Sequence, residues 1–272
     1  MFEALKLDEP TRVNMKLLLK IIIGIVVLFM LAIGLILFLT GDMVKTGDAF
    51  FTSLKNNDIN SAYNYLSEDF KSSTDEEQFS MFIKNNSLSE FKESSWEERS
   101  INGGRGVLTG SITTESGGVI PIKLSFVKGD QGWKIYSVEK PASGFQEQAE
   151  VNSIPSEEDQ VKMIMVASEQ FAKAVSMKSS ADFHATFSSQ FKQQFSVEKL
   201  DEIYKSFYDL GADLNVLKNY SPIFEEKPSI DENGILRIKG YYPTEPNKFY
   251  FNQTYIYEGL GWKLMGYSVN IK

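Results

Sequence analysis

The pentapeptide GWKIY occupies residues 132–136, and a close copy, GWKLM, occupies residues 261–265, a shift of 129 positions. Upstream of each pentapeptide, further pairs share a shift of 121 positions, among them Phe70 with Phe191. One constant shift across the earlier segments, followed by one constant shift at the end, indicates a duplication with about eight extra residues in the second copy. The chain beyond residue 43 therefore reads as two similar domains in tandem.

Each copy changes from helical to strand periodicity part of the way along. In the first copy, apolar residues recur at helical spacing over 44–56 and 62–70, and a Thr-Asp-Glu-Glu capping box at 74–77 opens a third helix. Further on, apolar and polar residues alternate, which predicts antiparallel strands over 106–113, 120–127 and 133–139. A Gly-Asp-Gln-Gly loop joins the last two strands. We expect three helices followed by an antiparallel sheet.

The apolar stretch IIIGIVVLFMLAIGLILFLT at residues 21–40 contains no charge and has the length that a helix needs to cross a bilayer. Basic residues precede it, which by the positive-inside rule places the N-terminus in the cytoplasm. We expect an uncleaved transmembrane helix in a bitopic protein of the plasma (inner) membrane, with periplasmic or extracellular C-terminal domains. A cleaved signal peptide is the alternative, and it is disfavoured because its apolar region would be shorter.

The predicted fold class is α+β, with one N-terminal transmembrane helix before the tandem domains. Residues 141–160 include several acidic side chains and no Lys or Arg, which is typical of a solvated linker, and they end in a helix start capped by Ser156. The expected segments are a cytoplasmic tail at 1–20, the transmembrane helix at 21–40, a first domain at 44–140, an acidic linker at 141–160 and a second domain at 161–272.

The composition excludes several classes of function. The net charge is −8, which disfavours nucleic acid as a partner because phosphate binding needs clustered Lys and Arg. The chain has no cysteine, so disulfides, thiolate zinc sites and cysteine nucleophiles are excluded. The acidic runs lack the Gly-centred loop of calcium sites, and no Gly-rich phosphate loop is present. We expect no metal and no cofactor.

Each half resembles the nuclear transport factor 2-like superfamily, also called SnoaL-like or cystatin-like. The likeness rests on the Phe of the opening helix (Phe50 and Phe171), on the segments LSEDF at 66–70 and FSSQF at 187–191, and on the closing GWK strand. It covers nearly all of both predicted domains. The resemblance implies two cone-shaped domains, in each of which a curved antiparallel sheet wraps around three helices and leaves a pocket at its open end. Members include enzymes, cargo binders and structural modules, so the resemblance leaves the function open.

Aromatic residues gather on the predicted strands of the second domain. Where both faces of a strand carry aromatic side chains, one face meets the helix core and the other is a candidate for a ligand pocket or a protein interface. The candidate residues are Tyr241, Tyr242, Phe249, Phe251, Tyr255, Tyr257 and Trp262.

His184 is the single histidine and the one candidate for acid–base work. Asp182 precedes it by two positions, and such side chains do not face each other on a helix. A packed or half-exposed histidine is therefore the favoured interpretation, and no catalytic residue is predicted.

These patterns favour a membrane-anchored, non-catalytic scaffold or accessory subunit of a cell-envelope complex. Such a protein would bind other envelope proteins through its extracytoplasmic domains, and homo-oligomer formation is left open. The architecture resembles inner-membrane scaffold subunits of type IV secretion systems, which typically carry a single such domain. The alternative is a binding module for a small apolar ligand in the pocket of the second domain, and the third hypothesis is an enzyme that uses His184.

Overall fold

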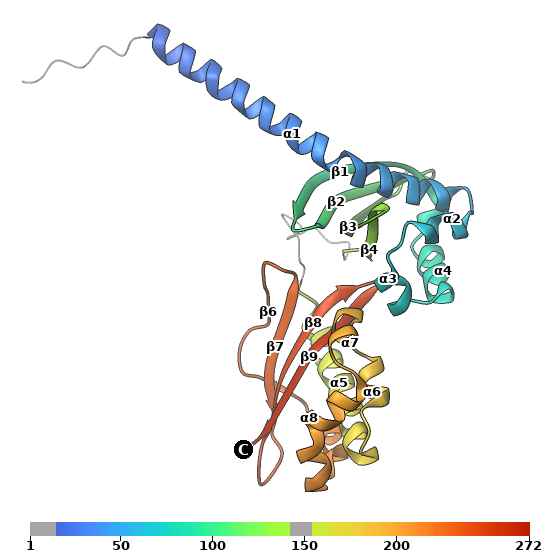
Figure 1. Cartoon of the computed structure of the whole chain (residues 1–272), viewed down its shortest axis with the longest axis vertical. Helices are drawn as coiled ribbons and strands as arrows, with labels where there is room; N and C mark the ends of the chain where they lie inside the picture. Colours follow the sequence, from blue (N-terminus) through green and yellow to red (C-terminus); the bar gives the residue numbers. More distant parts are fainter. Residues whose placement is uncertain (1–14, 142–153) are drawn as a thin grey trace, which may run out of the picture. The chain divides into compact units, whose positions relative to one another are not determined.

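The computed structural model describes residues 15–141 and 154–272 (Figure 1). The chain divides into two compact units between Asp42 and Met43. Most of the tail predicted at 1–20 and of the linker predicted at 141–160 lies outside the described residues. The unit that begins at Met43 contains two hydrophobic cores, one before and one after residues 142–153. The predicted domain boundaries stay a prediction.

Helix α1 (Met15–Lys55) includes the predicted membrane span. Its described side chains at 23–31 are exposed. Within the described part of the chain, no helix has the length and hydropathy needed to cross a membrane. This finding overturns the transmembrane helix predicted at 21–40. The bitopic inner-membrane localisation and the periplasmic placement fall with it.

The first half combines short helices with a four-stranded antiparallel sheet in the order β1-β2-β3-β4 (Figure 1). The last turns of α1 pack on this sheet, because at Gly47 a Cβ would already lie 3.2 Å from Leu124. The other elements are α2 (Ile59–Asn64), α3 (Glu68–Ser73), α4 (Glu76–Asn85), the 3-10 helix η1 (Leu88–Glu90), β1 (Phe91–Asn102), β2 (Arg105–Thr114), β3 (Val119–Gly129) and β4 (Gly132–Glu139).

The second half places helices against one face of an antiparallel sheet in which β5, β7, β8 and β9 follow one another and β6 also pairs with β7 (Figure 1). Ser156 caps the first helix by accepting a hydrogen bond from the Asp159 backbone N–H, as predicted. The elements are α5 (Glu157–Met177), α6 (Ala181–Ala185), α7 (Ser189–Gln194), α8 (Val197–Leu210), η2 (Leu214–Asn219), β5 (Ile223–Phe224), β6 (Ser229–Ile230), β7 (Ile235–Tyr242), β8 (Phe249–Glu258) and β9 (Gly261–Ile271).

The helix predicted over 62–70 is wrong as a single element, because the chain breaks between α2 and α3. Leu66 forms a parallel bridge with Ile135 of β4, and Ser67 then caps α3 through the Phe70 backbone N–H. Phe187 and Leu264 repeat the bridge in the second half. The expectation of three helices in each domain therefore gives way to more numerous, shorter helices. The mixed helix and antiparallel-sheet content is present in both halves.

Candidate functional site

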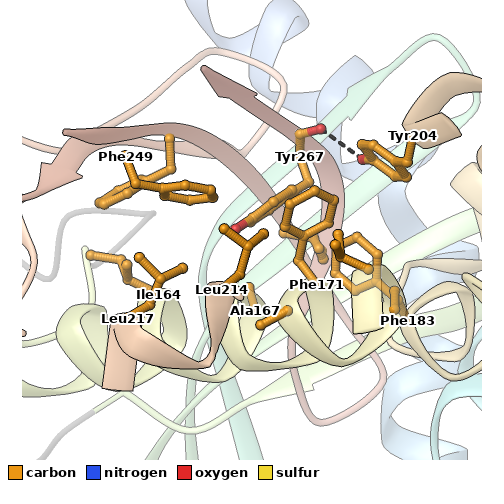
Figure 2. Close-up of a cluster of buried hydrophobic side chains, with 14 of the residues drawn as sticks. Ile164, Ala167, Phe171, Phe183, Tyr204, Leu214, Leu217, Phe249 and Tyr267 are labelled. Atoms are coloured by element: carbon orange, nitrogen blue, oxygen red, sulfur yellow. Dashed lines mark hydrogen bonds between the residues drawn. The ribbon is translucent and has the colours of Figure 1, made fainter. Parts of the chain in front are cut away.

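Four of the predicted aromatic candidates belong to the core of the second half: Tyr242, Phe249, Phe251 and Tyr255. Figure 2 shows Phe249 near Ile164 and Leu217, and the Tyr204 hydroxyl donating to the Tyr267 carbonyl at 2.9 Å. The Phe171 ring packs between helix and sheet, with its centroid 5.1 Å from that of Tyr267. Burial raises the pKa of Tyr255 and of Tyr267, which remain neutral. These four side chains thus pack within the core of the second half.

His184 is placed as a structural residue. Its Nε2 lies 2.7 Å from the Phe195 carbonyl oxygen, so the ring N–H donates to the backbone at the end of α7. Asp182 pairs with Lys173 at 2.6 Å and does not reach the imidazole. Among the residues described, no cluster of His, Asp or Glu is arranged to hold a metal ion. These contacts give the ring a packing role.

Tyr241 lies on the other face of the second sheet from the core. Its ring pairs across strands with Tyr250 at 5.4 Å, and the Lys248 ammonium lies 4.5 Å from the Tyr241 ring centroid. Lys272 stands over the Tyr250 ring at 5.7 Å. Cross-strand aromatic pairs of this kind stabilise a sheet. The positions of Tyr241 and Tyr250 are therefore explained by sheet stability, and no binding partner has to be invoked.

The remaining candidates, Tyr257 and Trp262, flank the β8–β9 turn, which joins the two halves. The Val138 backbone N–H donates to the Gly259 carbonyl at 3.0 Å, and the Gly259 N–H donates to the Tyr136 carbonyl at 3.1 Å. Leu260 packs against the core of the first half. A turn of the second half therefore continues the sheet and the core of the first.

A buried carboxylate completes this junction. Glu258 is 0% exposed and accepts hydrogen bonds from the Tyr136 hydroxyl at 2.9 Å and from the Ser189 hydroxyl and backbone N–H at 3.0 and 3.1 Å. Burial, followed by the neighbouring carboxylate, raises the pKa of Tyr136, so the phenol stays a donor. The Ser72 and Ser189 hydroxyls lie 2.6 Å apart where α3 meets α7. Because Glu258 accepts these hydrogen bonds in a buried site, it holds Tyr136 and Ser189 in one arrangement.

A cleft of about 780 Å³ lies beside the junction and takes its walls from both halves. Trp262 and Tyr257 lie in its wall with their rings edge to face at 5.4 Å. Two turns border it, at 102–105 and at 232–235. The lining residues from the first half are Ser100, Asn102, Gly103, Arg105, Gly106, Val107, Lys123, Ser125, Phe126, Tyr136 and Glu139, and those from the second are Gln190, Glu232, Asn233, Gly234, Ile235, Ile256, Tyr257, Trp262 and Met265.

The chemistry of the cleft suits binding. Lys123 and Glu139 form an ion pair at 3.5 Å, while the Arg105 guanidinium stacks 5.4 Å from the Tyr136 ring centroid. No histidine or cysteine is among the lining residues, and nothing in the described part of the chain supports catalysis. Aromatic, apolar and amide groups together are typical of a recognition surface.

The cleft was not predicted as a site, although Tyr257 and Trp262 were. The residues that build it come from two separate stretches of the sequence, 100–139 and 190–265. The one available signal was a departure from the repeat, because the turn before GWK reads Gly-Asp-Gln-Gly in the first copy and Glu-Gly-Leu-Gly in the second.

Comparison with known proteins gives little beyond this geometry. The chain matches no protein-family model, and no curated protein is similar to it. Among solved structures, it is similar to a cystatin-like protein from Ruminococcus gnavus ATCC 29149, with 13% identity, a TM-score of 0.26, and coverage of 83% of this chain and 88% of that one. The chain thus has a cystatin-like structural neighbour, and a match at this TM-score supports neither the tandem arrangement nor an activity.

Proposed function

We propose that the protein is a non-catalytic binding module that holds an extended segment of a partner protein in the cleft between its halves. The observation that carries this proposal is the cleft itself, which is lined from both halves and lies beside a junction fixed by the buried Glu258. A surface formed by two halves that cannot shift freely is preorganised, so a partner avoids part of the ordering cost of binding.

The lining favours a polypeptide over a small apolar ligand. The side-chain amides of Asn102, Gln190 and Asn233 make no hydrogen bond within the described protein, and each offers both a donor and an acceptor. An extended chain presents N–H and C=O groups that such amides can pair with. Apolar side chains between them, including Ile256 and Met265, can receive the side chains of the segment.

A cleft-blocking experiment tests this function. Random peptides displayed on phage are selected on the full chain, and binding of the selected peptides is then measured after a bulky maleimide is attached to a single cysteine. Because the chain has no cysteine, Asn102→Cys at the rim of the cleft and Asn270→Cys on β9 each supply one exposed thiol.

We expect the label at position 102 to weaken peptide binding at least about tenfold and the label at position 270 to leave it unchanged. Equal binding in both labelled proteins, or a selection that yields no binding peptide, would contradict the proposed function.

A further inference from the structure

We infer that the cleft anchors its partner through a carboxylate, held by the guanidinium of Arg105; this inference rests on the proposed function and names the chemistry of the same site. Arg105 begins β2 directly after the Gly103-Gly104 turn, and its side chain is exposed where it lines the cleft. Within the described residues it forms no ion pair and no side-chain hydrogen bond. An arginine with all its donors available is the group that binds carboxylates in a two-pronged geometry.

The Arg105 guanidinium is also held in place by the aromatic ring against which it packs. It stacks on the Tyr136 ring, which is 3% exposed, and the Tyr136 hydroxyl is itself fixed by its hydrogen bond to Glu258. A ring anchored at its far end offers a firm face for the planar cation, which reduces the side-chain freedom that binding would have to remove. The residues that join the halves thus also orient the proposed anchor.

The charges nearby favour a carboxylate over a phosphate. Glu139 and Glu232 line the same cleft, and Lys123, the other cation that lines it, already pairs with Glu139. Phosphate groups are usually bound by several cationic or N–H donors, whereas one guanidinium matches one carboxylate in a two-pronged geometry. The proposed ligand group is therefore an Asp or Glu side chain, or a chain-terminal carboxylate, within the bound segment.

The decisive experiment compares acid and amide forms of the same peptides. Peptides selected on the full chain are synthesised with each carboxylate in turn converted to its amide, and their Kd is measured for the wild type, for Arg105→Gln and for Arg237→Gln. Arg237 is an exposed arginine on β7 and does not line the cleft, so it is the matched control.

We expect one amide substitution to weaken binding at least about tenfold in the wild type and in Arg237→Gln, and to have no effect in Arg105→Gln. Peptides that compete at the cleft but bind equally as acid and amide would overturn the carboxylate anchor and leave the proposed function standing.

A second measurement addresses the anchor without any selected peptide. The Nε–H resonance of Arg105 is followed by NMR while N-acetylglycine, N-acetylglycinamide or inorganic phosphate is added to the full chain. A shift with N-acetylglycine, none with the amide and a weaker response to phosphate are expected. No shift with N-acetylglycine, or a stronger response to phosphate, would overturn the inference.

Discussion

The same hairpin turn occurs twice in this chain and ends in opposite environments. In the first half, residues 129–131 of the turn before GWK are exposed to solvent. In the second half, the equivalent turn at 258–261 is inserted into the first half, with Glu258 0% exposed and Leu260 packed on the foreign core. Both hairpins have two loop residues, but positive φ falls at Gly132 in the first and at Gly259 in the second. The side chains differ as well: Asp130 and Gln131 suit water, whereas Glu258 and Leu260 find donors and an apolar surface.

The surface that receives the turn differs between the halves as well. Tyr136 donates to Glu258, and its equivalent in the second half, 129 positions later, is Met265, which has no hydroxyl to donate. One turn of the second half and one receiving strand of the first half thus join the two halves. The cleft exists because of that junction.

The largest effect is expected from Glu258→Ala. It leaves the Tyr136 hydroxyl and the Ser189 N–H buried without an acceptor, which should lower the free energy of unfolding by about 3 kcal/mol. Asp130→Ala in the exposed turn should change it by less than about 0.5 kcal/mol. Urea denaturation measures both, and similar values for the two variants would contradict the comparison.

Alanine substitutions at two glycines distinguish the cost of backbone strain from the cost of overpacking. Gly259 and Gly132 both have positive φ, at +65° and +98°, so a side chain strains either one. An added Cβ at Gly259 would lie 2.3 Å from Thr74 Oγ1, whereas nothing lies within 4 Å at Gly132. Gly259→Ala should therefore cost about 2 kcal/mol more than Gly132→Ala, as overpacking typically does. Thermal or urea unfolding of the two variants measures this difference. An equal loss of stability in Gly132→Ala and Gly259→Ala would refute the prediction.

Leu260→Ala removes the apolar contact between the turn and the first core. Because Leu260 is half-buried, we expect a loss of about 1.5 kcal/mol, at the lower end for burial of a leucine side chain. Gln131→Ala at the equivalent position is the control and should be near neutral, since Gln131 is exposed. A neutral Leu260→Ala in the same denaturation assay would show that the turn does not contribute to the core.

The smallest effect concerns alkaline pH. The pKa of Tyr136 is raised in the folded protein. The protonated phenol therefore contributes fully to the free energy of unfolding below the unfolded-state pKa of about 10, and this contribution is lost as the pH rises above that value. In Tyr136→Phe, the free energy of unfolding should fall less steeply with pH above pH 10, by about 1 kcal/mol per pH unit. Denaturation curves at pH 9, 10 and 11 provide the measurement, and identical slopes for wild type and variant would contradict the role of Tyr136.

Local patterns predicted the local elements well. Alternation over 120–127 and the Gly-Asp-Gln-Gly loop correspond to β3 and its turn into β4, because both signals depend on neighbouring residues. Strand β1 went unpredicted: most of its residues are exposed on both faces, so it shows no alternation, and its pairing with β2 is interrupted by register shifts. The capping box also begins one residue later than expected, with Asp75 as the cap and Gln78 as its partner.

The candidate site could be predicted only in fragments. The aromatic pattern selected Tyr257 and Trp262, which line the cleft, together with Tyr242 and Phe249, which lie in the core. No local pattern distinguishes a cleft residue from a core residue on adjacent strands. Glu258 gains its role from contacts between the halves, and the role proposed for Arg105 depends on its contact with Tyr136, which lies on another strand of the same half. Such contacts follow from tertiary packing, which periodicity does not encode.

The central claim is that the second turn is inserted in the first half while its counterpart is free, and thiol labelling tests it most directly. In this cysteine-free chain, Leu260→Cys and Gln131→Cys place single thiols at equivalent positions of the two turns. We predict that the cysteine at 260 reacts with a maleimide at least about tenfold more slowly, because position 260 is partly buried against the first core whereas Gln131 is exposed. Equal labelling rates at the two positions would contradict the account.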